Sequence, residues 1–284
     1  MKVSKIVAIV IWSLVAILLT VFLVFAVNGN WDIGSFSFNR SIKYANAENY
    51  SVGSFESDEK IDSVEINWQS GKVTVVAYDG KTLKCTESES ENDNRKMRWL
   101  IEDGKLTVQF SKPNLWLGIG SNGKKELAVY IPRDFFPLTE VRVNKVSSDV
   151  SADSIECADL VIDNVSGELS VSNAECDMLC VDTVSGDVDA AGSVATLEFE
   201  TVSGNLKLND GIMPSRVDFD SVSGNAILCM PEGDGFAAKF DSVSGGFECD
   251  FPTVKNDGKY VFGDGSGIYS FESVSGNITV KKAG

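Results

Sequence analysis

Hydrophobic residues recur at fixed offsets from a Val-Ser-Gly unit that repeats through the second half of the chain. Apolar side chains fall five and three residues before each Val, at the Val itself, and four and six residues after it. A spacing of two is the period of a β-strand with one buried face. Each unit therefore predicts a strand, a tight turn for which Gly supplies backbone freedom, and a second strand. The units begin at Val165, Val184, Val202, Val222, Val243 and Val274, and Val146-Ser147-Ser148 is an imperfect seventh copy.

Successive units lie 19, 19, 18, 20, 21 and 31 residues apart. A repeat that buries only one face must stack on its neighbours to form a core. The pattern predicts an all-β fold, a mostly parallel β-solenoid with about 19–21 residues per regular rung. Stacking in sequence order would align Phe199, Phe219, Phe240 and Phe271 in one ladder. An antiparallel sandwich also has short, regularly spaced strands, but it does not require the same residue at the same offset in every unit.

The repeat also defines the domain organisation. Regular rungs cover 141–284, and degenerate rungs around Gly71 and Gly104 extend the solenoid back through 61–140. Segment 28–60 is polar with scattered aromatic residues, and we expect it to be a spacer.

A hydrophobic segment precedes the spacer. Residues 6–27 contain no charged side chain and are long enough to cross a bilayer as a helix, so segment 1–27 is predicted to be a cytoplasmic tip followed by a single transmembrane anchor. Lys2 and Lys5 precede the apolar run, which places the N-terminus in the cytoplasm and the solenoid outside it. A cleaved signal peptide ending near Val24-Phe25-Ala26 is the alternative.

Charge and residue usage exclude several functions. The 284 residues carry 25 Lys and Arg against 41 Asp and Glu, a formal net charge of −16, which disfavours nucleic acid as a partner. The chain has no His, the commonest general base and zinc ligand. We therefore expect no enzyme activity and no cofactor. The six Cys residues are too few for a disulfide framework, although Cys157 and Cys176 fall on neighbouring rungs and could pair.

Two outward-facing columns follow the repeat. Ser follows each Val, and we interpret this column as turn chemistry, with hydroxyl groups bonding nearby backbone atoms. An acidic column two residues before each Val is more simply a solubilising face, and weak Ca²⁺ binding is the alternative. The predicted Ca²⁺ ligands are Asp163, Asp182, Glu200, Asp220 and Asp241. Leu115, Trp116 and Leu117 form an apolar loop tip that is a candidate binding site, or a cap on one end of the solenoid.

The copies Thr183-Val184-Ser185-Gly186-Asp187-Val188 and Thr201-Val202-Ser203-Gly204-Asn205-Leu206 resemble a bacterial putative-adhesin family of unknown function. The resemblance implies a parallel β-helix on the bacterial envelope and transfers no catalytic residue. We expect a non-enzymatic, adhesin-like or scaffolding solenoid that contacts an envelope or extracellular protein or polysaccharide. An accessory role in envelope-stress signalling is the alternative. A Ca²⁺-dependent polysaccharide-binding or polysaccharide-degrading β-helix is less favoured, because every rung carries the same carboxyl group and no local break marks an active site.

Overall fold

The computed structural model describes residues 44–88, 92–113 and 125–283. These residues form twenty β-strands and two short 3-10 helices, Ala47–Asn49 and Arg133–Phe135. The all-β class expected from the sequence is therefore correct. No helix among the described residues is long and apolar enough to cross a membrane, and the predicted anchor at 6–27 lies outside them.

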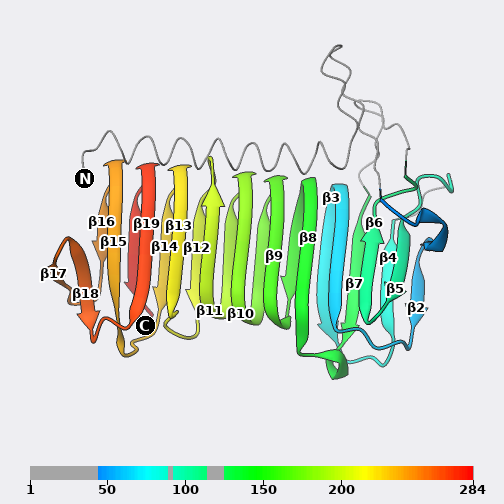
Figure 1. The fold of residues 1–284 in the computed structure, drawn as a ribbon, viewed down its shortest axis with the longest axis horizontal. Helices are drawn as coiled ribbons and strands as arrows, with labels where there is room; N and C mark the ends of the chain where they lie inside the picture. Colours follow the sequence, from blue (N-terminus) through cyan, green and yellow to red (C-terminus); the bar gives the residue numbers. More distant parts are fainter. Residues whose placement is uncertain (1–43, 89–91, 114–124, 284) are drawn as a thin grey trace, which may run out of the picture.

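The regular repeats stack side by side along the long axis of the molecule (Figure 1). Equivalent residues pair in parallel register, so Leu160, Leu179 and Leu197 of successive rungs are neighbours. The strands of this stack are β8 (Leu138–Asp153), β9 (Glu156–Ser166), β10 (Leu169–Ser185), β11 (Val188–Thr201), β12 (Leu206–Asp210), β13 (Arg216–Ser223), β14 (Ala226–Met230), β15 (Gly235–Ser244), β16 (Phe247–Cys249), β19 (Gly267–Ser275) and β20 (Ile278–Lys282).

The stacking order differs from the sequence order at the C-terminal end. Strand β19 pairs with β13 on one side and β15 on the other, so the last rung of the chain lies between two earlier ones (Figure 1). The aromatic ladder therefore runs Phe199, Phe219, Phe271, Phe240, which corrects the predicted order. The 31-residue spacing before Val274 contains a hairpin of β17 (Val254–Asn256) and β18 (Lys259–Gly263), and β18 pairs antiparallel with the start of β15.

The N-terminal end of the stack begins with an irregular, partly antiparallel group of strands. Strand β3 (Ser63–Tyr78), which contains Gly71, pairs in parallel with β8 and forms a rung as predicted. The predicted rung at Gly104 is wrong, because Asp103 and Gly104 form the turn of an antiparallel hairpin between β5 and β6. The remaining strands are β1 (Ser51–Val52), β2 (Phe55–Ser57), β4 (Leu83–Glu87), β5 (Arg98–Glu102), β6 (Lys105–Gln109) and β7 (Leu127–Pro132).

Four of the five predicted apolar columns form the core, including Phe199, Phe219 and Phe271, each 0% exposed. The fifth column is wrong, because the repeated Val is half-buried at most positions and Val243 is 47% exposed. The inward-facing positions five and three residues before each Val are followed by a third, one residue before the Val. The residue before each Val therefore faces inward in place of the Val itself. The inward-facing residues of this column that are fully buried are Lys145, Asn164, Thr183, Thr201, Ser221 and Ser273.

The repeated Gly is required mainly for close packing between rungs. A Cβ atom on Gly224 would lie 2.0 Å from the carbonyl oxygen of Gly204, and one on Gly276 would lie 1.9 Å from that of Gly224. Among the six Val-Ser-Gly units, only Gly167 has a positive φ, 121°. The sequence analysis explained the repeated Gly by its backbone freedom, and this explanation applies at Gly167. At the other units Gly is required because any side chain would collide with the adjacent rung.

Candidate functional site

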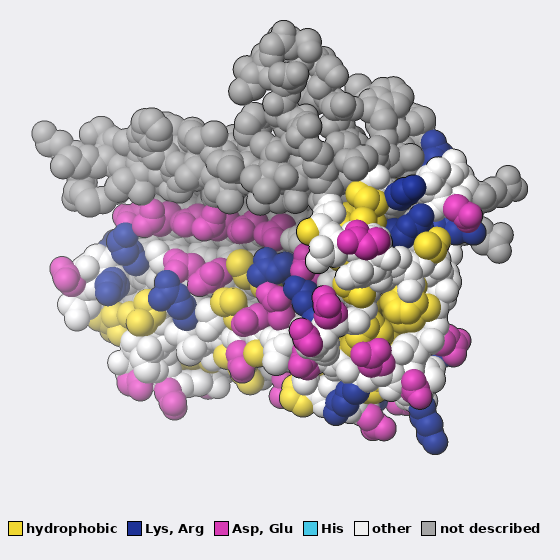
Figure 2. Space-filling view, turned by 45° about the vertical axis from the view of Figure 1, so that its right-hand side comes forward, with side chains coloured by type: hydrophobic (Ala, Val, Ile, Leu, Met, Phe, Trp, Pro, Cys, Tyr) yellow, Lys and Arg dark blue, Asp and Glu magenta, His cyan; other side chains and the backbone are white. Residues whose placement is uncertain are grey.

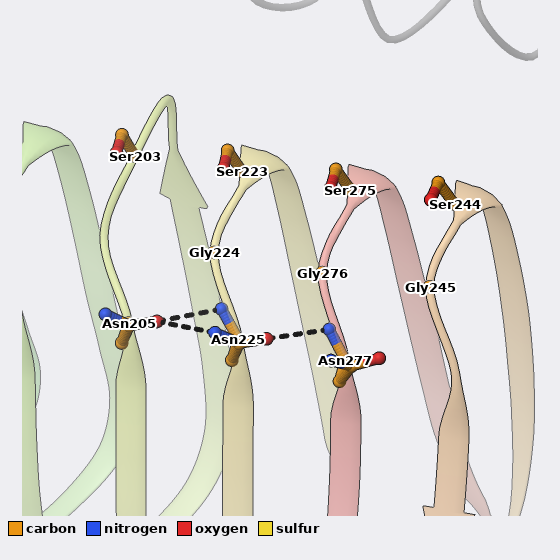
Figure 3. Close-up of a pocket in the computed structure, with 10 residues that line it drawn as sticks. All are labelled: Ser203, Asn205, Ser223, Gly224, Asn225, Ser244, Gly245, Ser275, Gly276 and Asn277. Carbon is orange, nitrogen blue, oxygen red and sulfur yellow. Dashed lines mark hydrogen bonds between the residues drawn. The ribbon is translucent and has the colours of Figure 1, made fainter.

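The Val-Ser-Gly turns form an open polar groove that crosses four rungs, with a volume of about 530 Å³ (Figure 3). Serine hydroxyl groups line its upper rim, Asn side chains lie below them, and Gly backbone forms the surface between. The groove therefore presents uncharged hydrogen-bonding groups once per rung. We call it the Ser/Asn groove, and its lining residues are Ser203, Asn205, Ser223, Gly224, Asn225, Ser244, Gly245, Ser275, Gly276 and Asn277.

A chain of side-chain hydrogen bonds holds the Asn residues in position. The backbone N–H and the Nδ2 of Asn225 donate to Oδ1 of Asn205 at 3.1 and 3.0 Å (Figure 3). The backbone N–H of Asn277 donates to Oδ1 of Asn225 at 2.9 Å, and that of Gly246 donates to Oδ1 of Asn277 at 2.9 Å. At the other end, Asp187 Oδ1 accepts both equivalent bonds from Asn205. The Asp or Asn three residues after Val184, Val202, Val222 and Val274 therefore satisfies a backbone donor of the adjacent rung, and its side-chain orientation is fixed.

The Ser hydroxyl groups differ from their expected role in the turns. In the described part of the chain, the side chains of Ser203, Ser223, Ser244 and Ser275 are exposed and form no hydrogen bond with protein atoms. They are consequently available to an external ligand. The repeated Ser and Asn at fixed offsets could have indicated this surface from the sequence. The sequence analysis assigned the Ser residues to turns and did not consider the Asn residues.

A second open depression, of about 850 Å³, continues the surface below the groove and shares its three Asn residues. Its lining includes the acidic side chains of Glu168, Asp187 and Asp189 at the end nearer β10. Lys207 forms an ion pair with Asp189 at 3.2 Å. The two depressions together form one continuous surface, which is polar in the Ser/Asn groove and partly apolar below it, where Ile227 is exposed.

The predicted acidic column forms a continuous ladder along the stack, which we call the acidic ladder. Figure 2 shows Asp and Glu side chains in an unbroken row along the molecule. Cations occupy the two ends: Arg142 lies 3.4 Å from Asp163, and Lys239 lies 2.5 Å from Asp241. Lys239 also lies 3.4 Å from Glu272. The described residues provide no ion pair for Asp182, Glu200 or Asp220. In stacking order the members are Asp163, Asp182, Glu200, Asp220, Glu272 and Asp241.

The middle of the ladder resists ionisation. Burial, followed by repulsion from Glu200, raises the pKa of Asp182 from 3.8 to about 7. Burial and repulsion from Glu272 raise the pKa of Asp220 to about 7 as well. The pKa of Glu200 is also raised, chiefly by burial. Carboxyl groups held in this way favour protons or bound cations, since either would relieve the repulsion.

The structure brings all five predicted Ca²⁺ ligands into one row and inserts Glu272 between Asp220 and Asp241. Strand spacing separates successive members by about 4.7–4.9 Å, so the ladder is a line of carboxyl groups rather than an enclosing cage. Within the described ranges, no group of three or more potential ligands has a geometry that could hold a metal ion. Calcium binding therefore stays a prediction.

The candidate tip at Leu115, Trp116 and Leu117 lies outside the described residues. Lys125 is the first described residue after 113. It is buried, and its Nζ lies 2.6 Å from Oε2 of Glu87. The same ammonium donates to the carbonyl oxygen of Phe110 at 2.6 Å and lies 4.7 Å from the ring centroid of Trp68. These contacts link β4 to the residues before β7 at the N-terminal end of the stack, and no pattern in the sequence indicated them.

Cys157 and Cys176 are neighbours in the parallel register, as the spacing predicted. Both are buried, and both are free thiols in this structure. Burial raises the pKa of each thiol to about 12, so neither is a reactive thiolate at neutral pH.

The family model described as Toastrack DUF4097 matches residues 61–211, just over half of the chain. This chain belongs to the Toastrack family. The match runs from β3 to the rung that contains β12. Among curated proteins, none matches this Toastrack chain.

Three solved structures are similar to this chain at low sequence identity. A putative cell adhesion protein from Clostridium sporogenes is 14% identical, with a TM-score of 0.37 over 82% of this chain and 100% of its own. A putative adhesin from Bacteroides fragilis is 10% identical, with a TM-score of 0.39 over 82% and 97%. A putative adhesin from Parabacteroides distasonis is 13% identical, with a TM-score of 0.30 over 82% and 97%.

Proposed function

We propose that this Toastrack protein is a non-enzymatic, adhesin-like module whose binding surface is the Ser/Asn groove. The observation that carries the proposal is the repetition of uncharged hydrogen-bonding groups along an open surface, with a Ser on each of four rungs and an Asn on three of them. The body is a parallel β-solenoid on the outer side of the cell membrane, held there by the N-terminal anchor helix at 6–27. The apolar, uncharged composition of that segment and the preceding Lys2 and Lys5 support this placement.

The chemistry of the groove favours an extended, uncharged, hydroxyl-rich ligand. Hydroxyl and amide groups recognise such a ligand by hydrogen bonding, and no charged side chain lines the groove. The Asn side chains are fixed before binding, so little side-chain entropy is lost when a ligand contacts them. A rung spacing of about 4.7–4.9 Å presents equivalent contacts to a polymer at regular intervals. A polysaccharide strand of the cell envelope has these properties.

The arrangement is better suited to binding than to catalysis. General acid–base chemistry needs titratable groups that converge on one reacting bond. The Ser/Asn groove contains no acidic or basic side chain, and the acidic ladder repeats its carboxyl group uniformly on the strands that enter the turns.

Binding is tested with the full chain in detergent and polysaccharide fractions from the envelope. Ser223→Lys places a long charged side chain in the middle of the groove and should weaken binding at least tenfold. Ser185→Lys, in the same column but outside the groove lining, is the matched control and should bind like the wild type. Equal binding by both variants would contradict the assignment of the groove.

The topology is tested separately by adding protease to intact, wall-stripped cells that carry the full chain. A body on the outer side of the membrane is digested, whereas a cytoplasmic control protein survives. Protection of the body until the cells are lysed would contradict the extracytoplasmic placement and leave the groove assignment intact.

A further inference from the structure

The Asn side chains of the Ser/Asn groove supply an external ligand with more hydrogen-bond donors than acceptors. Oδ1 of Asn205 already accepts two bonds from Asn225, and Oδ1 of Asn225 and of Asn277 each accept one backbone N–H. A backbone N–H can only donate, so these bonds fix each amide with its oxygen toward the adjacent rung. In the described part of the chain, one N–H of Asn225 Nδ2 and both of Asn277 Nδ2 have no partner. This row of amides is therefore suited to a ligand that presents hydrogen-bond acceptors.

The charges around the groove favour an uncharged acceptor. The whole chain has a formal net charge of −16, and the exposed Asp187 and Asp189 line the adjoining depression. Carboxylate, sulfate and phosphate groups would be repelled there. Lys207 also lines this depression, but its ammonium is paired with Asp189 at 3.2 Å. A neutral carbonyl oxygen accepts hydrogen bonds without this repulsion.

An apolar side chain lies directly below the free amide donors. Asn225 and Ile227 are both exposed and are separated by the fully buried Ala226, so they face outward on the same rung. Ile227 is 36% exposed and lies between Lys207 and Thr279 of the two flanking strands. Strand geometry places alternate residues about 7 Å apart. One acetyl group can therefore direct its oxygen to the Asn225 amide and its methyl group to Ile227.

The apolar contact is a local break in the repeat. Five of the six Val-Ser-Gly units carry a polar or charged residue at the position of Ile227, five residues after the Val. In sequence order the residues at this position are Ser170, Asp189, Lys207, Ile227, Glu248 and Thr279. The combination of a free amide donor and an exposed apolar side chain thus belongs to the rung of Val222.

We infer that the ligand of the groove is a polysaccharide that carries acetamido groups, and that the rung of Val222 binds one of them. This inference rests on the proposed function of the groove. Nδ2 of Asn225 donates to the acetamido oxygen, and the acetamido methyl group packs on Ile227. The exposed hydroxyl of Ser223 on the same rung meets the hydroxyl groups of the sugar ring. A hydroxyl group in place of the acetamido group would provide no methyl contact with Ile227.

Calorimetry with two matched sugar tetramers tests the inference on the full chain, in a detergent without a sugar headgroup. One probe is the β-1,4-linked tetramer of N-acetylglucosamine, and the other is the β-1,4-linked tetramer of glucose, which differs only in the acetamido group. The N-acetylated tetramer should bind about tenfold more tightly, because it adds a hydrogen bond and a methyl contact. Equal affinities would overturn the inference.

A substitution locates the acetamido contact. Ile227→Ser should weaken binding of the N-acetylated tetramer about fivefold, because the buried methyl group loses its apolar partner. Ile212→Ser is the matched control, since Ile212 is 40% exposed and lines neither depression, and it should bind like the wild type. Equal affinities of the two variants would contradict the role of Ile227.

Failure of this inference can be distinguished from failure of the proposed function. A wild-type protein that binds neither tetramer, or both equally, overturns the acetamido assignment. Binding of Ser223→Lys to the envelope polysaccharide fractions then decides separately whether the groove is the binding surface. Weaker binding by Ser223→Lys would keep the groove and remove only the acetamido group.

Discussion

Replacing Asp220 by Asn should stabilise the protein at alkaline pH and leave its stability at acid pH unchanged. Burial and the neighbouring carboxyl groups of Glu272 and Glu200 raise the pKa of Asp220 from 3.8 to about 7 in the folded protein. The folded state therefore holds this proton more tightly than the unfolded chain does. The resulting stability is fully present below 3.8, the ordinary pKa, and is lost as the pH rises through about 7.

The expected magnitude follows from this difference in pKa. A rise from 3.8 to about 7 would correspond to about 4 kcal/mol at a site shielded from water, because each tenfold change in proton affinity is worth about 1.4 kcal/mol. Asp220 faces outward and is only partly buried, so water screens most of this energy. We expect Asp220→Asn, and likewise Asp182→Asn, to raise the free energy of unfolding by about 1 kcal/mol at about pH 8.

Urea unfolding of the full chain in detergent, at about pH 4 and about pH 8, measures this difference. The exposed Asp177→Asn is the control, since Asp177 lies outside the acidic ladder. The comparison with wild type at each pH removes the opposite effect of other carboxyl groups, such as Asp153, whose pKa is lowered by hydrogen bonds. The reasoning is refuted if Asp220→Asn is no more stable than wild type at the higher pH, or if its gain is equal at both.

Three other predictions concern the same stack. Phe219→Ala removes a fully buried ring stacked on Phe199 at 5.4 Å and should cost about 3–5 kcal/mol in urea unfolding, whereas a variant as stable as wild type would reverse its inward assignment. Gly224→Ala places a methyl group against the Gly204 carbonyl and should lower the melting temperature more than Ser223→Ala, whose side chain is exposed; equal losses would contradict the close-packing role of Gly. Millimolar Ca²⁺ should raise the melting temperature relative to chelator and to Mg²⁺ at equal ionic strength, because it neutralises the acidic ladder; identical melting temperatures would leave the ladder as a solubilising face.

The sequence alone determined the repeating unit and most of the core. Period-two alternation around each Val-Ser-Gly predicted the buried Phe219 and the outward Asp220, because strand geometry sends successive side chains to opposite faces. The spacing of 18–21 residues between all but the last pair of units predicted that equivalent residues such as Leu179 and Leu197 would be neighbours. Strand alternation is a local property of the sequence. Because the unit is repeated, the same alternation could be checked in several copies.

The inward or outward position of the repeated Val could not be decided in this way. Val is apolar, so composition favoured burial, yet the strand continues through the residue before it without a break. Thr183 and Thr201 consequently face the core and Val184 and Val202 are half-exposed. Periodicity near a turn is ambiguous by one residue, because a one-residue shift exchanges the two faces of a strand.

The order of the rungs and the nature of the candidate sites were decided by tertiary structure. Every regular rung presents the same columns, so the repeat pattern does not predict that the unit around Val274 lies between β13 and β15. The Ser/Asn groove and the raised pKa of Asp220 both require knowing which rungs are adjacent. A repeat specifies its own strands through local alternation, whereas adjacency between identical units depends on how the connecting segments and the two ends of the stack pack in space.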